Sequence, residues 1–380
     1  MPVRTVSSLV DVPRASWQGL AQRGNPFLDW RYLVALERSG AVGPESGWHP
    51  RHLLLERSGQ LLAALPLYLK DHSWGEFVFD FAWAEAYRRA GIPYYPKLVA
   101  AVPFTPVPGP RVLVAPGVDR ADAATALLEA ARELAGMLRA SSLHLLLPDD
   151  SQLDLLRAGG LSLRQDCQFH WFDEGYGDFE GFLGALTAEK RKKFRRERRR
   201  VMEAGIRFEW RSGAEIDATL FDEVYRFYAS SFLRRGMAPY FPPAFWAEVF
   251  ETMPDSIRVV LARIGTQAVA AAIFFIGGGT LYGRYWGCDE DYHSLHFETC
   301  FYQGIELALA EGCQRFEPGA QGEHKLRRGF RPVATWSGHW LARAEFARAI
   351  DAWLARERLH TRAYMDAARR HLPFRRGESG

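Results

Sequence analysis

A nineteen-residue pattern that occurs twice is the feature that most restricts how this chain can fold. Residues 51–69 read RHLLLERSGQLLAALPLYL and residues 258–276 read RVVLARIGTQAVAAAIFFI, and the two align without a gap. Each copy begins with Arg, alternates apolar residues, turns at a glycine-containing polar pair before Gln60 or Gln267, and becomes apolar again. This pattern predicts a β-hairpin in each half of the chain.

The segments after the two copies also follow a common order. A helical run at 121–138 and a strand at 143–148 follow the first copy. A strand at 280–287, a helix at 295–310 and a strand at 313–318 follow the second. Hairpins can recur by chance, but the ungapped agreement and the shared order favour duplication. The sequence therefore predicts two α/β domains with mixed sheets and helices on their faces.

The second half has further predicted elements and a helical end. They are a strand at 168–172, helices at 178–186 and 188–204, a strand at 206–210, helices near 217–234 and 242–252, and a tail at 341–370. We place a domain boundary near Gln165. The predicted domains are an N-terminal domain at 1–165, a C-terminal domain at 166–340 with the basic helix 188–204, and a helical tail at 341–380.

Composition indicates an ordinary globular protein. Of 380 residues, 48% are hydrophobic and 24% are charged, a balance that excludes a disordered chain. The N-terminus lacks the apolar run of a secretory signal, and the longest apolar run, at 268–276, has the length of a strand. The four cysteines form no CxxC pair. We expect a cytoplasmic protein with reduced thiols.

Positive charge is concentrated at one place. Residues 187–200, TAEKRKKFRRERRR, hold nine lysines and arginines against two glutamates, although the whole chain has a net charge of only +3. A solvated helix face is the simplest reading of such a run, but nine cations that repel one another favour an anionic partner. Charged tRNA, a nucleotide-linked precursor and acidic lipid headgroups all fit, and Phe194 could stack on a base. The candidate polyanion-binding residues are Lys190, Arg191, Lys193 and Arg195.

Residues 316–330, FEPGAQGEHKLRRGF, combine carboxylates, an amide, an imidazole and ammonium groups around Gly319 and Gly322. The segment could be a solvated loop. However, so many polar side-chain types at the end of a predicted strand are typical of a functional loop at the carboxyl edge of a sheet.

Several stretches carry a family resemblance. They are NPFLDWRYLVALERSG (25–40), GWHPRHLLLE (47–56), YYPKLVAAVPFTPVPGPRVLV (94–114), LYGRYWG (281–287), LHFETCFYQGIE (295–306) and EPGAQGEHKLRRG (317–329). Together they resemble the FemAB-like group of predicted bacterial N-acyltransferases, and the resemblance spans nearly the whole chain. It implies an α/β fold of two tandem GNAT-like acyltransferase domains.

The resemblance also implies an activity. FemAB enzymes take an aminoacyl group from a charged tRNA and transfer it to an amine, whereas other GNAT enzymes use acyl-CoA. The expected acceptor is a small-molecule or peptide amine. Because no nucleophile-plus-base motif is visible, direct transfer is favoured over ping-pong chemistry. Two alternatives stay open: an acyl-CoA-dependent N-acyltransferase, and a non-catalytic protein that binds a polyanion through the basic helix.

The segment that would bind CoA pyrophosphate departs from the GNAT pattern. That pattern places glycines at a helix N-terminus so that backbone N–H groups can approach phosphate. In the alignment to residues 293–298, His296 and Glu298 stand at the two glycine positions. A large residue would block the phosphate and an anionic one would repel it. Ordinary CoA binding is therefore disfavoured.

Acyl transfer to an amine needs a base and groups that stabilise the oxyanion. The candidate catalytic residues are Glu298, Glu317, Glu323 and His324. The candidate substrate-binding residues are Arg284, Tyr285, Trp286, His296, Gln321 and Lys325 in the second domain, and Asp80, Trp83, Tyr95 and Lys97 in the first. The latter four could equally be core residues. No metal is expected, because the spacing of histidines and cysteines matches no standard ligand pattern.

Overall fold

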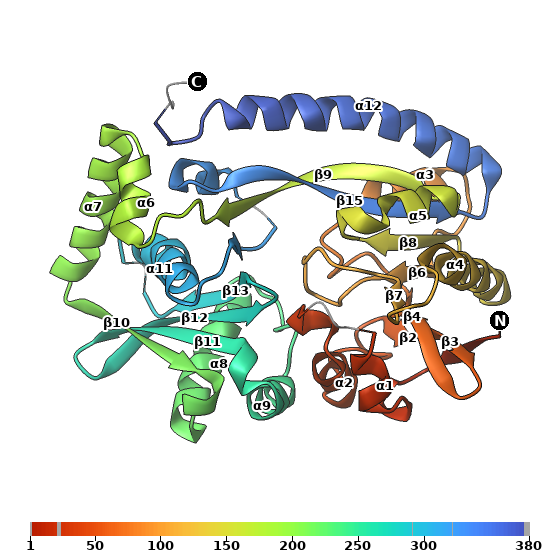
Figure 1. Ribbon diagram of the computed structural model, residues 1–380, viewed down its shortest axis with the longest axis horizontal. Coiled ribbons are helices and arrows are strands. Elements are labelled where there is room, and N and C mark those ends of the chain that lie inside the picture. Colours follow the sequence, from red (N-terminus) through yellow and green to blue (C-terminus); the bar gives the residue numbers. More distant parts are fainter. Residues whose placement is uncertain (1, 21–23, 291, 321, 376–380) are drawn as a thin grey trace. The chain divides into compact units, whose positions relative to one another are not determined.

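The computed structural model describes residues 2–20, 24–290, 292–320 and 322–375 (Figure 1). Internal contacts divide the chain into two units. Unit 1 consists of Met1–Cys167 and Ala334–Tyr364, and unit 2 of Gln168–Val333 and Met365–Gly380. The first segment of unit 1 ends at Cys167, two residues after the boundary that we place near Gln165. The C-terminal helix α12 (Ala344–Arg369) contributes residues to both units.

Unit 1 contains a four-stranded sheet and a group of strands with one parallel pair. The first has the order β1-β3-β4-β7, and the second pairs β8 with β6, β6 with β5 and β5 with β2, where β6 and β8 are parallel. The strands are β1 (Val3–Val6), β2 (Trp48–Pro50), β3 (His52–Arg57), β4 (Gln60–Leu65), β5 (Tyr68–Lys70), β6 (Lys97–Ala100), β7 (Leu113–Val114) and β8 (Ser142–Leu146). The helices are α1 (Arg14–Gln18), α2 (Trp30–Arg38), α3 (Phe81–Arg89), α4 (Arg120–Met137) and α5 (Leu153–Ala158).

Helix α4 organises the core of unit 1. It begins where the Asp119 carboxylate accepts hydrogen bonds from the first backbone N–H groups, which otherwise lack partners. Leu127, Leu128 and Leu134 recur at helical spacing and are buried against leucines of β3, β4 and β8. Burial of an apolar side chain stabilises a fold by about 1.5–3 kcal/mol. Burial of this apolar face is therefore the main contribution that stabilises α4.

Unit 2 is built on a sheet with the strand order β10-β11-β12-β13-β14-β9. Its neighbours are antiparallel except for β13 and β14, which are parallel. The strands are β9 (Ser162–Phe172), β10 (Ile206–Ser212), β11 (Ile257–Ile264), β12 (Gln267–Gly277), β13 (Thr280–Cys288), β14 (Arg315–Glu317) and β15 (Arg331–Leu341). Strands β9 and β15 each continue into unit 1.

Helices cover both faces of this sheet (Figure 1). One face carries α8 (Ala218–Leu233) and α9 (Pro243–Thr252), and the other carries α6 (Phe179–Ala185), α7 (Ala188–Glu203) and α11 (Gln303–Ala310). A short α10 (Leu295–Phe297) and a π-helical segment (Glu298–Tyr302) precede α11, so the predicted helix at 295–310 is confirmed but contains an irregularity.

The two predicted hairpins are confirmed, and each contains a register shift at the equivalent position. β3 pairs with β4 and β11 pairs with β12. The register shifts between Leu55 and Glu56 in the first hairpin and between Ala262 and Arg263 in the second. These positions coincide in the ungapped alignment. A β-bulge inserts an extra residue into one strand, so its recurrence at one alignment position is a structural mark of duplication.

Gly287 sets how closely α8 approaches β13. A Cβ atom at this position would lie 1.8 Å from the carbonyl oxygen of Phe227. Gly287→Ala should therefore push α8 away from the sheet and lower the free energy of unfolding by about 1–3 kcal/mol. Urea or thermal unfolding measures the change.

Gly184, near the end of α6, supplies the matched control. No atom lies within 4 Å of its ideal Cβ position among the described residues. Gly184→Ala should leave stability unchanged or raise it by up to about 1 kcal/mol, because alanine favours a helix. Equal stabilities of the two variants would contradict the tight α8–β13 packing.

Candidate active site

A cavity of about 170 Å³ lies within unit 2 at the sheet edge where β13 and β14 separate. It gathers six of the predicted site residues. Its lining consists of Ala272, Ile273, Phe274, Gly283, Arg284, Tyr285, Trp286, His296, Cys300, Phe301, Pro318, His324 and Lys325. The candidates Arg284, Tyr285, Trp286, His296, His324 and Lys325 thus share one enclosure, whereas Gln321 lies outside the described residues.

A β-bulge directs Arg284 toward this enclosure. On β12, Ile273 pairs with Tyr285 but the next residue, Phe274, pairs with Gly283, so Arg284 is the extra residue. A bulge changes the direction of the side chain it carries. The Arg284 side chain is only 4% exposed, and its guanidinium lies 3.9 Å from a carboxylate oxygen of Glu317. The buried acid balances part of the buried positive charge.

Two glycines shape the loop after β14. Gly319 and Gly322 have φ angles of +94° and +118°, which side chains other than glycine rarely adopt. A Cβ atom on Gly322 would also lie 2.4 Å from Cε1 of His324. The glycine therefore lets the imidazole fold back over the turn that begins the 3₁₀ helix Glu323–Arg328.

The His324 imidazole packs beside three rings while the residue stays partly exposed to solvent. Its ring centroid lies 5.5 Å from that of Phe301, 5.9 Å from that of Phe297 and 6.0 Å from that of His296. Partial burial lowers the pKa of His324, and the positive charges of Lys325 and Arg328 lower it further. Burial likewise lowers the pKa of His296 to about 4. Both imidazoles are therefore uncharged at neutral pH and can accept a proton or a hydrogen bond.

Lys325 is a buried lysine whose amine changes its protonation state near neutral pH. The residue is 3% exposed, and its Nζ donates a hydrogen bond to the carbonyl oxygen of Gly319 over 2.7 Å. Burial lowers the pKa of Lys325 to about 7, and the nearby Arg284 contributes to the decrease. The charged and neutral forms are therefore both populated at pH 7.

The predicted carboxylates are not among the described residues that line the cavity. Glu317 is 1% exposed and lies 3.1 Å from Nε of Arg315. Glu298 is 3% exposed and accepts hydrogen bonds from Arg198 and Gln303. Burial raises the pKa of both carboxyl groups, and the neighbouring arginines oppose that effect. Glu323 is exposed.

The π-helical segment Glu298–Tyr302 is a feature that sequence reasoning missed. Such segments are frequent at functional sites because one extra residue per turn changes the direction of the side chains. Here Cys300 and Phe301 line the cavity. Burial raises the pKa of the Cys300 thiol well above its usual value, so the group is a poor nucleophile. The motif LHFETCFYQGIE marked this region, but not the irregularity.

The predicted cations of helix α7 make contacts within unit 2. Lys190 lies 3.6 Å from Glu189, Lys193 3.7 Å from Glu197 and Arg195 2.5 Å from Glu180, while Arg191 donates to the carbonyl oxygens of Leu183 and Gly184. Phe194 is 1% exposed and packs against Tyr302, so the hypothesis that it stacks on a base is wrong. Lys192 and Arg196 are exposed, and we find no acidic partner for either within the described ranges.

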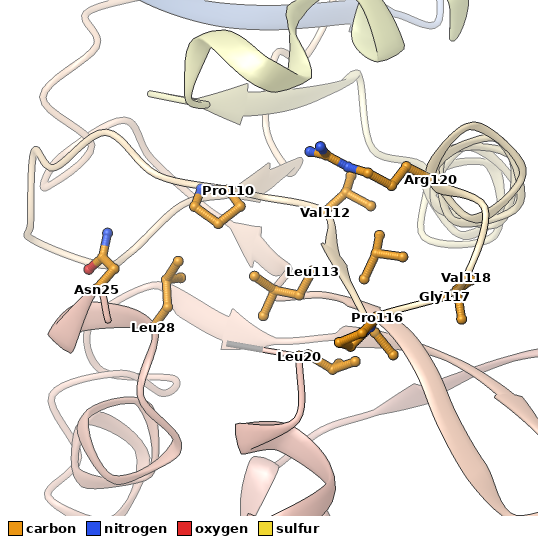
Figure 2. Close-up of a pocket in the computed structure, with 12 residues that line it drawn as sticks. Leu20, Asn25, Leu28, Pro110, Val112, Leu113, Pro116, Gly117, Val118 and Arg120 are labelled. Carbon is orange, nitrogen blue, oxygen red and sulfur yellow. The ribbon is translucent and has the colours of Figure 1, made fainter. Parts of the chain in front are cut away.

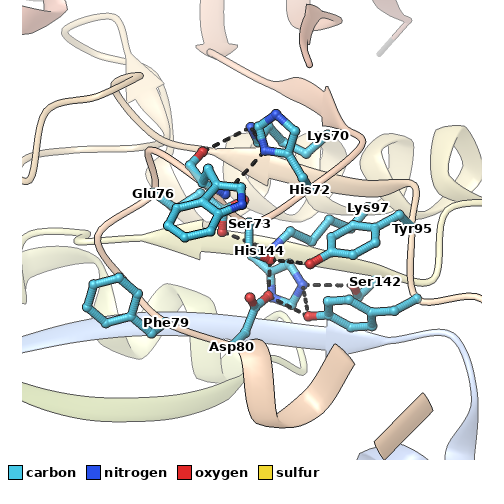
Figure 3. A network of polar contacts seen from close by, with 12 residues as sticks. Lys70, His72, Ser73, Glu76, Phe79, Asp80, Tyr95, Lys97, Ser142 and His144 are labelled. Carbon is cyan, nitrogen blue, oxygen red and sulfur yellow. Dashed lines mark hydrogen bonds and ion pairs between the residues drawn. The ribbon is translucent and has the colours of Figure 1, made fainter. Parts of the chain in front are cut away.

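Three of the four candidates in unit 1, Asp80, Tyr95 and Lys97, belong to a separate polar cluster (Figure 3). The fourth, Trp83, packs against His144 of that cluster. The Nζ atom of Lys97 donates to Glu76 over 2.8 Å and to Asp80 over 2.5 Å. Burial opposes ionisation of Asp80, but the Lys97 ammonium, His144 and Ser73 together lower the pKa of that carboxyl to about 2. Asp80, Lys97 and Trp83 are buried. Tyr95 is half-buried, and with Phe81 it lines a hollow of about 400 Å³.

Another hollow in unit 1 lies beside β7 and has a volume of about 270 Å³ (Figure 2). Its lining is mostly aliphatic, with Asn25 at one end and Arg120 at the other (Figure 2). Arg120 is the sole titratable residue among its described lining residues. This hollow therefore lacks a base, unlike the cavity in unit 2.

Two more properties of the described residues bear on metal and membrane binding. No group of three or more His, Cys, Asp or Glu side chains in them is arranged to hold a metal ion. None of their helices combines the length and the apolar character needed to cross a membrane.

Comparison with known proteins identifies related sequences and folds. A sequence model of the FemAB-like family, described as peptidoglycan biosynthesis/recognition, matches residues 8–376. A search of curated proteins gave no match.

Three solved structures share the fold. A structure of FemX has a TM-score of 0.56 at 10% identity, covering 92% of this chain and 100% of that one. The C-terminal domain of a putative lysylphosphatidylglycerol synthetase from Agrobacterium fabrum has a TM-score of 0.54 at 12% identity, covering 90% and 96%. L-PGS from Bacillus licheniformis has a TM-score of 0.51 at 11% identity, covering 85% and 95%. The predicted fold class, an α/β chain of tandem GNAT-like domains with a C-terminal helical tail, is confirmed.

The buried charge of Lys325 should reduce stability in a pH-dependent way. Because its pKa falls from 10.5 unfolded to about 7 folded, the unfolded state binds more protons between those values, and stability rises with pH there. Lys325→Met should be more stable than the wild type at pH 6.5. The difference should shrink by roughly 3 kcal/mol at pH 9.5, since one pKa unit corresponds to about 1.4 kcal/mol.

Urea unfolding at both pH values measures this difference. Lys192→Met, which removes an exposed lysine from α7, is the control and should show no comparable pH dependence. A difference for Lys325→Met that stays constant with pH would show that the ammonium is not buried.

Proposed function

The chain belongs to the FemAB-like family, and from this premise we propose that it transfers an acyl or aminoacyl group to an amine acceptor at the unit 2 cavity. The observation that carries the proposal is the meeting of His324, Lys325 and Arg284 around one enclosure. These side chains supply a neutral imidazole, the Arg284 guanidinium and a Lys325 amine that is charged in part of the molecules at pH 7, which are the kinds of groups that acyl transfer requires. The family description favours a peptidoglycan precursor as the source of the acceptor amine.

The reaction follows from the chemistry of these groups. The acceptor nitrogen attacks the carbonyl carbon of the donor, and an N–C bond forms. Lys325 and Arg284 stabilise the negative charge that develops on the carbonyl oxygen. The nitrogen loses a proton to His324. The bond between carbon and the leaving oxygen or sulfur then breaks, and His324 returns the proton to the leaving group.

His324 is the base that the geometry favours among the four candidates. It lines the cavity and is neutral at pH 7. Glu298 and Glu317 are instead engaged by arginines. The buried Cys300 thiol keeps its proton and is a poor nucleophile, which favours direct transfer over an acyl-enzyme formed on this residue.

Replacing His324 tests the assignment of the base. His324→Gln should lower the rate of amide formation by about 10²–10⁴, because general-base catalysis contributes that much. The assay measures transfer of a radiolabelled amino acid from a mixture of charged tRNAs to a nucleotide-linked peptidoglycan precursor peptide. Arg327→Gln, an exposed position on the same 3₁₀ helix, is the matched control and should retain activity. Full activity of His324→Gln would refute the assignment.

The donor is tested separately. His296 occupies the start of the helix at 295–310, where it lies 4.9 Å from the Trp286 ring, and Glu298 follows it in the first turn. We therefore favour an aminoacyl-tRNA donor over acyl-CoA. Thermal-shift titration should show stabilisation by charged tRNA and none by CoA or acetyl-CoA. Stabilisation by acetyl-CoA alone would support the acyl-CoA-dependent alternative.

A further inference from the structure

The outer face of α7 carries four exposed cations, of which at least two have no acidic partner among the described residues. Lys192, Arg196, Arg199 and Arg200 are exposed there. For Lys192 and Arg196 we find no acidic partner within the described ranges, and Arg199 lies 4.0 Å from Glu203. Residues four apart on a helix are about 6 Å apart along its axis, so this face offers a row of positive charges.

The chemistry of this face suits a phosphate backbone better than a lipid surface. A helix that lies in a membrane interface exposes a large apolar face. In α7 the apolar residues Phe194 and Val201 are buried in the unit, and Met202 is the one large apolar side chain that α7 exposes. Cations without apolar neighbours are the usual means by which proteins hold the phosphates of nucleic acids.

The inner face of the same helix leads to the proposed base. Glu197 is 6% exposed, and its carboxylate accepts hydrogen bonds from the Tyr302 hydroxyl and, over 3.2 Å, from Arg328. The Arg328 guanidinium lies 3.3 Å above the centroid of the Phe297 ring. It also donates to the carbonyl oxygen of His324 over 3.0 Å. The contacts therefore run without a break from Glu197 to the backbone of His324.

A second set of contacts joins α7 to the π-helical segment. Arg198 donates to Glu298 over 3.2 Å and to Glu306 over 2.7 Å. Arg200 lies 3.3 Å from His293, three residues before His296 in the cavity. Helix α7 is thus tied by hydrogen bonds to the helical segment 295–310, which carries His296 and Cys300, and to the 3₁₀ helix that carries His324.

We propose that the outer face of α7 binds the phosphate backbone of an RNA, and that Glu197 and Arg328 are positioning residues that couple this binding to His324. The coupling rests on the proposed function, in which the RNA is the donor and His324 the base. A buried carboxylate that accepts from both Tyr302 and Arg328 ties the two faces together, because loss of either contact would leave a buried charge incompletely paired.

RNA binding is tested by fluorescence anisotropy with an uncharged RNA hairpin across a range of salt concentrations. Lys192→Glu/Arg196→Glu should weaken binding at least about tenfold and reduce the salt slope by about 2, one for each lost phosphate contact. Arg235→Glu/Arg370→Glu changes the net charge equally at exposed positions elsewhere in unit 2 and should bind like the wild type. Equal weakening by both double variants, or binding to anionic vesicles but not to the hairpin, would overturn the proposal.

Coupling is tested by the NMR signal of the His324 imidazole, which is assigned by its absence in His324→Gln. Addition of the hairpin should shift this signal in the wild type. Glu197→Gln should bind the hairpin with unchanged affinity and lose the shift. Tyr302→Phe, a milder change that removes one hydrogen bond to Glu197, should reduce the shift if Glu197→Gln fails to fold. An undiminished shift in both variants would exclude Glu197 as a positioning residue.

Neither measurement depends on catalysis. If the protein binds RNA and shows the His324 shift but forms no amide, the proposed transferase function is wrong and the present proposal stands. If the protein forms the amide but its His324 signal does not shift when RNA is added, the present proposal is wrong and the transferase function stands.

Discussion

The parallel pairing of β13 with β14 is the constraint on which the cavity depends. Three residue pairs, from Thr280↔Arg315 to Tyr282↔Glu317, place the two strand ends side by side. Beyond them β13 continues to Arg284, while the chain after Glu317 turns away through Gly319. Parallel strands bring their carboxyl ends to one edge, so residues about forty positions apart in sequence face one enclosure.

That enclosure is costly for stability. Arg284 and Lys325 place positive charge where little water reaches, and Glu317 lies beside Arg284 but forms no short ion pair with it. Proteins tolerate such unfavourable burial where it serves chemistry, because a desolvated cation stabilises developing negative charge more strongly than an exposed one. The aromatic rings of Phe297 and Phe301 beside His324 act in the same direction by keeping the imidazole neutral.

Much of the fold could be predicted because its signals are local. Apolar periodicity and turn residues predict the two hairpins, helix α4 and the helix at 295–310. The segments with the predicted site residues from Arg284 to Trp286 and from His324 to Lys325 lie in one region because the parallel pairing of β13 and β14 brings them there. Other predictions depended on side-chain direction. Glu298 points to Arg198, and Lys193 to Glu197, since helix rotation decides which face is buried.

The sequence by itself determined the duplication, the family and the loop that carries His324, since these follow from order, spacing and residue type along the chain. Only the tertiary structure decided which polar residues face the cavity. The bulge at Arg284 and the π-helical segment at Glu298–Tyr302 each insert one residue into a regular repeat. A single inserted residue rotates every side chain that follows, and that rotation depends on packing against distant strands and helices.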